Sequence, residues 1–431
     1  MAAVPGQVAV GGGDPVACTV EAAEDGVRVG GGVQAFIAYD DIDDLLDDSY
    51  TLRIAVEDGS RYDFGMLGRA YGQIAADIVK RRDASLEKNL LLRGVNLRDT
   101  YPGMLLGEDA LQPVGATFRL YEDLLVVRPD HGVMFGVPFS AVDAVDWDAE
   151  LYQAHIRLDD GTTVTIGKLA KRSEEFTGEL RRLLDALAER TRATLSGLLP
   201  DVSPGTITAL AGAMRDGRAV QKRTVDAIDP GLWPKLATAV LGSRRDSYER
   251  LAAMTPDGWA AFGVKALKAA ASDEAAEEQP PAAEPEDPET GPEAERTVPG
   301  GGENRLWFFC PLSRDGVPIN AVASEVTSES GHATYVFRLM EPERFASLRG
   351  DELADEIGRA IGRLNRALLL LNFRREPLYA SEDEIRSGRL TRYRVALRLL
   401  PYLRWARESF LGRAAHTAGW DAAIDRILEK A

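Results

Sequence analysis

Arginine and aromatic side chains are interleaved between residues 386 and 413, and they form the clearest candidate binding pattern in the sequence. Glu408 is the one acidic residue there. Guanidinium groups bind phosphates through paired hydrogen bonds, and aromatic rings stack on bases, so the pattern suits nucleic acid. The candidate patch for an anionic partner comprises eight arginines: Arg386, Arg389, Arg392, Arg394, Arg398, Arg404, Arg407 and Arg413.

A second interpretation of the same stretch needs no ligand. An amphipathic helical hairpin, bent near Pro401, would bury its leucines and aromatic rings and leave its arginines at the surface. Some of these arginines would then pair with the acidic residues Glu382, Asp383 and Glu384. We favour this interpretation and keep nucleic-acid binding as the alternative.

Residues that could do catalysis or hold a metal are scattered. The four histidines (His131, His155, His332 and His416) have no metal-ligand spacing, and no GxSxG, Walker A or CxxC motif occurs. Ser173 and Cys310 have no histidine nearby in sequence, and the acidic run 40–48 lacks the order of a calcium loop. We therefore predict no catalytic residue, cofactor or metal, with an unrecognised enzyme in residues 304–431 as a further alternative.

The elements that position these residues are clearest between residues 114 and 187. Runs of alternating apolar residues at 116–121, 124–128, 139–145, 152–158 and 162–166 predict strands. Asp160-Gly161 between the last two runs predicts a tight hairpin. After Gly167 the apolar period changes to that of a helix, which predicts one closing helix through Leu187.

A similar plan occurs about a hundred residues upstream. Tyr39–Asp43 aligns with Phe139–Asp143, and Asp58-Gly59 aligns with Asp160-Gly161. A helix predicted after Leu67 matches the later one. A period of this length indicates duplication of a whole domain rather than a short solenoid repeat.

These patterns resemble the pleckstrin-homology superfold in its GRAM-like and bacterial branches. The segment VPFSAVDAVDWDAELYQAHIRLDDGTTVTIGKL, followed by SEEFTGELRRLL, carries the resemblance. It covers roughly residues 10–95 and 113–190 and implies two tandem β-barrel or sandwich domains, each closed by a C-terminal helix. Members of this superfold commonly bind peptides along a sheet edge or beside the closing helix.

The remaining chain predicts an α+β multidomain protein. We expect the two domains at 1–100 and 101–195, a helical segment at 196–272, and an α+β module at 304–431 with Arg-rich helices. Residues 273–303 contain six prolines and carry ten of the 17 net negative charges, so we expect a disordered acidic linker. Residues 1–100 and 101–200 carry net charges of −7 and −6.

The predicted function is that of a non-catalytic scaffold or adaptor whose pleckstrin-homology-like domains bind a protein partner. The sequence has no apolar run long enough for a membrane span and no convincing signal peptide, and its two cysteines are far apart, which favours a cytoplasmic location. Lipid-binding members place basic residues in the first hairpin loop, whereas Glu21–Gly26 and Glu122-Asp123 are acidic here. We therefore expect no binding to anionic membranes. The sequence does not indicate the oligomeric state.

Overall fold

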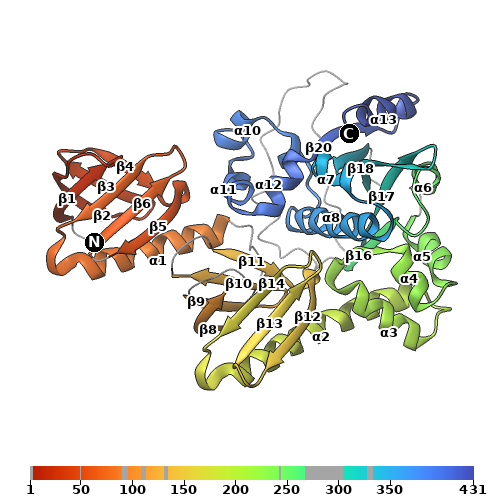
Figure 1. Cartoon of the computed structure of the whole chain (residues 1–431), viewed down its shortest axis with the longest axis horizontal. Coiled ribbons are helices and arrows are strands. Elements are labelled where there is room, and N and C mark those ends of the chain that lie inside the picture. The colour runs from red at the N-terminus through yellow and green to blue at the C-terminus, as the bar shows by residue number, and fades with distance from the viewer. Residues whose placement is uncertain are drawn as a thin grey trace. The chain divides into compact units, whose positions relative to one another are not determined.

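The computed structural model describes residues 3–48, 50–89, 96–107, 113–130, 134–241, 244–266, 304–327 and 333–431. The protein is α+β with three antiparallel sheets, which confirms the predicted fold class at this level (Figure 1). The chain divides into two compact units. Unit 1 comprises Met1–Leu184 with Arg363–Glu408, and unit 2 comprises Asp185–Gly362 with Ser409–Ala431. The expected acidic linker lies outside the described residues.

The first sheet of unit 1 has seven strands in the order β4-β3-β2-β1-β7-β6-β5. Its elements are β1 (Val4–Val10), β2 (Val16–Ala22), β3 (Gly26–Gly31), β4 (Ala35–Ala38), the 3-10 turn η1 (Tyr39–Asp41), β5 (Ile42–Asp48), β6 (Thr51–Val56), β7 (Arg61–Gly65), η2 (Gly68–Ala70) and helix α1 (Tyr71–Asn89). Tyr71, Ile74 and Ile78 of α1 are buried with apolar residues of the strands, so the helix closes the sheet's core.

The second sheet has the equivalent order, β11-β10-β9-β8-β14-β13-β12. Its elements are β8 (Leu97–Leu106), β9 (Val114–Tyr121), β10 (Leu124–Pro129), β11 (Phe135–Pro138), η3 (Phe139–Ala141), β12 (Val142–Asp148), β13 (Gln153–Leu158), β14 (Thr163–Gly167), η4 (Ala170–Arg172) and α2 (Ser173–Leu198). Phe176 of α2 is fully buried, with its ring centroid 5.1 Å from that of Tyr101.

The two sheets agree in local detail as well as in strand order. The register between β5 and β6 shifts at Ile42/Asp44, and that between β12 and β13 shifts at Val142/Ala144. The next hairpins turn through Gly59 at φ 85° and Gly161 at φ 87°, values that glycine adopts without steric cost. The strands and hairpin expected from the alternating residues at 152–166 are therefore present.

The rest of unit 1 consists of short helices. They are α9 (Glu376–Tyr379), α10 (Glu382–Arg386), η7 (Thr391–Tyr393), α11 (Arg394–Leu399) and α12 (Pro401–Glu408), preceded by the end of α8 (Gly350–Leu370). Ser381 caps α10 through a reciprocal capping box with Glu384. Pro401 begins α12, because a proline is tolerated in the first turn of a helix but not in its interior.

Unit 2 is built on the third sheet, with strand order β15-β16-β17-β18-β19-β20. Its strands are β15 (Val220–Gln221), β16 (Ala261–Ala266), β17 (Asn304–Arg314), β18 (Val317–Val326), β19 (Ala333–Arg338) and β20 (Phe410–Ala415). Its helical elements are α3 (Pro204–Ala213), η5 (Arg215–Gly217), α4 (Lys222–Ile228), α5 (Leu232–Leu241), α6 (Arg245–Ala253), α7 (Pro342–Ser347) and α13 (Trp420–Leu428), with the adjoining parts of α2 and α8.

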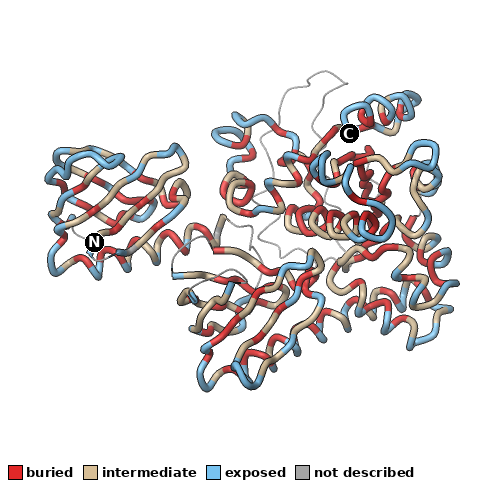
Figure 2. Tube along the Cα trace, viewed as in Figure 1, coloured by how far each residue is buried: buried red, intermediate tan, exposed pale blue. Residues whose placement is uncertain are grey.

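The core of unit 2 joins residues 196–266 with residues from the expected C-terminal module. Strand β16 pairs with β17 from Ala261↔Phe309 to Ala266↔Asn304, so the expected helical segment 196–272 also contributes strands to this sheet. Trp233 stacks on Phe262, with 4.4 Å between ring centroids, and α5 is thereby fixed on the sheet. Figure 2 shows buried positions concentrated along the strands and the inward helix faces.

Candidate functional site

The eight arginines of the candidate patch fall in different surroundings. Arg386 and Arg404 are exposed and form no ion pair within the described part of the chain. Arg389 is also exposed but pairs with Glu376 and lies 3.8 Å from Glu384. Arg413 is exposed on β20 in unit 2, whereas the other seven belong to unit 1.

Two of the remaining arginines bind groups within their own segment of unit 1, residues 363–408. Arg407 donates to the carbonyl oxygens of Pro377 at 2.9 Å and Ala380 at 2.7 Å, and it pairs with Glu382 at 2.9 Å. The Arg392 guanidinium donates to the Tyr393 hydroxyl at 2.7 Å. The expected pairing of this region with its own acidic residues is therefore present at Arg389 and Arg407.

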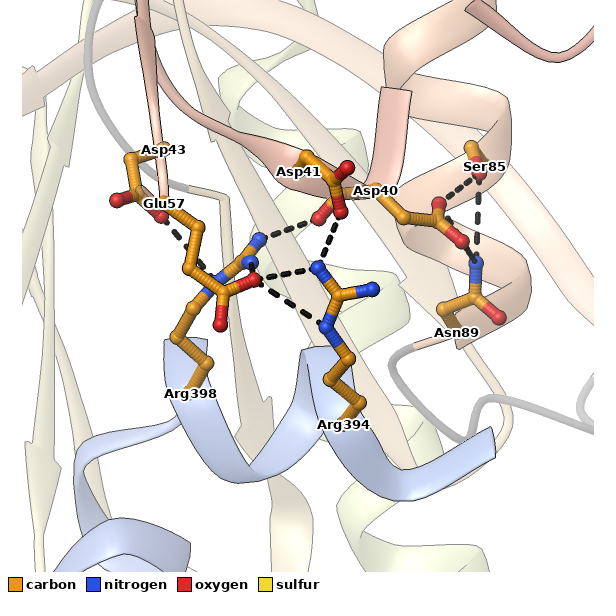
Figure 3. Close-up of polar contacts among 8 residues, drawn as sticks. All are labelled: Asp40, Asp41, Asp43, Glu57, Ser85, Asn89, Arg394 and Arg398. Atoms are coloured by element: carbon orange, nitrogen blue, oxygen red, sulfur yellow. Dashed lines mark hydrogen bonds and ion pairs between the residues drawn. The ribbon is translucent and has the colours of Figure 1, made fainter. Parts of the chain in front are cut away.

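Arg394 and Arg398 bind a group of carboxylates that we call corner 1, defined as Asp41, Asp43 and Glu57 (Figure 3). Arg394 Nη2 donates to Asp41 and Glu57, and its Nε donates to Glu57 at 3.2 Å. Arg398 Nη1 donates to the same Glu57 oxygen, and its Nε lies 3.2 Å from Asp43. Glu57 is therefore shared by both guanidinium groups.

The spacing of the two arginines follows from helix α11. Residues four apart lie on one face of an α-helix, so the side chains of Arg394 and Arg398 point the same way. Like charges at this spacing destabilise an isolated helix. The carboxylates of corner 1 offset that repulsion, while Val395, Ala396 and Leu397 of the same helix are buried.

The backbone of corner 1 is held by α1. The Asp40 carboxylate accepts from Asn89 Nδ2 at 2.8 and 2.9 Å and from the Ser85 hydroxyl, so it faces away from the two arginines (Figure 3). The Asp40 carbonyl oxygen accepts from Arg398 Nη2. The buried Arg82 donates from Nη2 to the carbonyl oxygen of Asp43 at 3.1 Å.

Electrostatics favours the charged form of Glu57. Partial burial raises the pKa of this carboxyl, but hydrogen bonds from Arg394 and Arg398 and their positive charge outweigh burial and lower it. Burial lowers the pKa of Arg394, and the carboxylates of Glu57 and Asp41 more than offset that effect. The ion pair between Glu57 and Arg394 is therefore fully charged at neutral pH.

The second sheet has an equivalent group, corner 2, defined as Asp159 and Asp160. Arg366 of α8 lies 2.6 Å from Asp159 through Nη2 and 3.2 Å from Asp160 through Nη1. The side chains are only 8%, 10% and 13% exposed, respectively. Burial alone would raise the pKa of Asp160. The hydrogen bonds from Thr162 and the charge of Arg366 outweigh burial, so the pKa of Asp160 is lower than its ordinary value. In corner 2, one buried guanidinium group thus binds two carboxylates through its two terminal nitrogens.

The two corners share one backbone hydrogen bond. The Glu57 N–H donates to the Asp41 carbonyl oxygen at 2.9 Å, and the Asp159 N–H donates to the Ala141 carbonyl oxygen at 2.9 Å. In each corner, the last residue of a 3-10 turn is thus hydrogen-bonded to the first residue after a strand, where the hairpin turn begins. Asp58 and Asp160 also match, since each accepts from the N–H two residues later, in Ser60 and Thr162.

The corner residues carry no sequence motif that marks them as a site. Asp41 and Asp43 entered only the acidic run 40–48 and the alignment of the two repeats, and Asp160 entered only the hairpin turn and that alignment. Arg366 was not singled out, because it lies in an ordinary amphipathic helix. The available signal was the alignment of the two hairpins, which places an acidic residue, Glu57 or Asp159, before each Asp-Gly turn.

Unit 2 contains a separate buried polar group. Glu325 is 1% exposed, and one of its oxygens accepts from the Thr334 hydroxyl and lies 3.0 Å from His416 Nε2. Trp420 Nε1 donates to the Thr334 oxygen at 2.8 Å. The Arg244 guanidinium lies 3.1 Å from His416 Nδ1. Because arginine can only donate, Nδ1 accepts and the ring proton resides on Nε2.

The other candidate reactive residues that the structure describes lie apart from one another and bond locally. His155 Nδ1 contacts the Thr165 hydroxyl at 3.1 Å, and the Ser173 hydroxyl donates to the Ala170 carbonyl oxygen at 2.9 Å. Cys18 and Cys310 are buried free thiols, and burial raises the pKa of each. No cluster of three potential metal ligands occurs among the described residues. His131 and His332 lie outside them.

Comparisons with known proteins give no family. The chain matches no protein-family model, and no curated protein matches it in sequence. One solved structure, the C-terminal domain of an unknown protein from Leishmania infantum, is similar at 9% identity with a TM-score of 0.21. That similarity covers 24% of this chain and 97% of the other. Within the described residues, no helix has the length and apolar character needed to cross a membrane.

Proposed function

We propose that this protein is a non-catalytic scaffold or adaptor in the cytoplasm. Its two N-terminal sheets act as pleckstrin-homology-like domains that bind protein segments. Seven antiparallel strands followed by a closing helix, present twice with one strand order, support this assignment of the fold. A shared fold does not establish a function, so the proposal depends on the corners rather than on the resemblance.

The observation that carries the proposal is the occupancy of both corners. Each sheet presents carboxylates at the same junction of 3-10 turn and hairpin, and each receives arginine from a helix of residues 363–408. Such an arrangement binds polypeptide and holds it in place.

The test is reconstitution with the full chain. We expect affinity capture from the native cell to recover a protein that then binds the purified full-length chain saturably and in a defined ratio. The matched control is the chain with Arg386→Ala and Arg404→Ala, which alters exposed charge away from the corners and should bind the partner equally. Failure to recover a saturable partner, together with measured turnover of a small molecule, would reject the scaffold.

Nucleic-acid binding remains our second proposal because Arg386 and Arg404 are exposed and form no ion pair in the described chain. Phosphate contacts made by these side chains would weaken steeply as salt is raised. A gel shift with the full chain at low salt, repeated with Arg386→Ala and Arg404→Ala, distinguishes this proposal from the scaffold.

A further inference from the structure

We propose that corner 1 is a recognition site for a partner helix that carries two arginines four residues apart. Helix α11 occupies this site within the chain, and the partner displaces it. The inference rests on the proposed scaffold function and specifies its ligand. Glu57 lies between Arg394 and Arg398, while Asp41 and Asp43 each bind one of them. The three carboxylates exceed the two guanidinium charges that they bind.

The contacts select arginine over lysine. Two nitrogens of Arg398 donate to separate acceptors, Nη1 to Glu57 and Nη2 to the Asp40 carbonyl oxygen. Its Nε lies 3.2 Å from Asp43, which is an ion-pair contact without a hydrogen bond. Arg394 binds Asp41 and Glu57 through Nη2 and Nε. The fixed fork of a guanidinium can satisfy such divergent acceptors, whereas a single ammonium on a flexible stem cannot reach all of them.

The receiving surface is built without the arginines. Asn89 and Ser85 fix the Asp40 side chain, and Arg82 binds the carbonyl oxygen of Asp43. The Glu57 N–H is bonded to the Asp41 carbonyl oxygen. These contacts come from the first sheet and α1, so the corner remains formed when α11 leaves, and an incoming helix meets an ordered site.

Corner 1 is open enough to exchange its ligand, whereas corner 2 is not. At corner 1 the carboxylates of Glu57, Asp41 and Asp43 are 24%, 32% and 43% exposed, and the side chains of Arg394 and Arg398 are 25% and 16% exposed. The three side chains of corner 2 are at most 13% exposed. Water and salt screen the first set of charges more than the second. Release at corner 1 therefore leaves the contacts of Arg366 with corner 2 in place.

The test uses a labelled synthetic peptide of residues 388–404 and fluorescence anisotropy with the full chain. The chain with Arg394→Ala and Arg398→Ala has lost its internal competitor, so we expect it to bind the peptide about tenfold more tightly than the wild type does. Adding Glu57→Gln and Asp43→Asn to this double variant should abolish its gain in affinity for the peptide. A chain with only Arg398→Ala should show an intermediate gain in affinity for the peptide. This single variant replaces the double variant in the test if the double variant does not fold.

The peptide itself supplies matched controls. A peptide with Arg392→Ala and Arg404→Ala should bind like the parent, while one with Arg394→Lys and Arg398→Lys should bind more weakly. Equal affinity for wild-type and arginine-depleted chains, no binding to either, or binding that survives loss of the corner carboxylates would overturn the inference. A captured partner whose affinity is unchanged by the corner 1 variants would leave the scaffold standing and remove only this recognition site.

Discussion

Glu57 and Asp159 occupy the same position in two separate sheets. The N–H of each donates over 2.9 Å to the carbonyl oxygen at the end of a 3-10 turn, and each carboxylate binds arginine. The arginines come from different helices, α11 and α8. The feature that the two sheets share is therefore the carboxylate site, and not the helix that supplies the arginine.

Burial should make the two corners unequal in stability. Arg366→Ala leaves Asp159 and Asp160 buried without their cation, which should cost about 3–5 kcal/mol in the free energy of unfolding. Arg394→Ala removes a more exposed ion pair, in which Glu57 keeps Arg398, and should cost about 1 kcal/mol or less. Urea unfolding of the full chain measures both. Equal losses would contradict the difference that we draw between the corners.

Acid should weaken corner 1. The pKa of Glu57 is lower in the folded protein than its usual value of about 4.3 in an unfolded chain. Its stabilising contribution is therefore complete above the unfolded value and disappears as pH falls through the folded one. The difference in unfolding free energy between the wild type and Glu57→Gln should be constant from pH 6 to 7 and shrink below about pH 4. A difference that grows in acid would show the sign to be wrong.

The buried group in unit 2 should be sensitive to loss of one hydroxyl. Thr334→Val removes the donor to Glu325 and the acceptor of Trp420 Nε1 at once, which should cost about 2–4 kcal/mol. Thermal unfolding of the full chain measures the loss. Thr208→Val is a useful control, since that hydroxyl bonds only the Pro204 carbonyl oxygen within an exposed helix turn. A change no larger than that of the control would show that the network contributes little.

Anionic membranes should not retain the protein. The two acidic loops join the second and third strands of their sheets, not the first two strands as the sequence suggested. The β2–β3 loop contains exposed Glu24 and Asp25, and Glu122 in the β9–β10 loop pairs with Arg98 at 2.6 Å. Neither loop offers the basic cluster that an anionic surface attracts. Full-length protein should remain in the supernatant when phosphatidylserine or phosphoinositide vesicles are sedimented at physiological salt. Substantial co-sedimentation would contradict the charge argument.

The sequence was most informative where local patterns decide structure. Alternating residues predicted the strands between 116 and 166, except that Phe139–Ala141 form a 3-10 turn where a strand was expected. The change of period after Gly167 predicted helix α2. It was least informative about long-range pairing. Nothing local shows that Ala261 pairs with Phe309, or that Arg394 meets a carboxylate 337 residues away. Ion pairs of this kind leave no periodic signal, so corner 1 required the fold.

The most direct test of the account is a double-mutant cycle between Glu57 and Arg398, with Asp159 and Arg366 as the parallel cycle. Unfolding free energies of Glu57→Gln, Arg398→Ala and the double variant give the coupling between the two side chains. We predict that the double variant is more stable than the sum of the single losses implies, by about 0.5–3 kcal/mol, with the larger coupling at Asp159 and Arg366. Additive losses at both corners would contradict arginine recognition by the sheets.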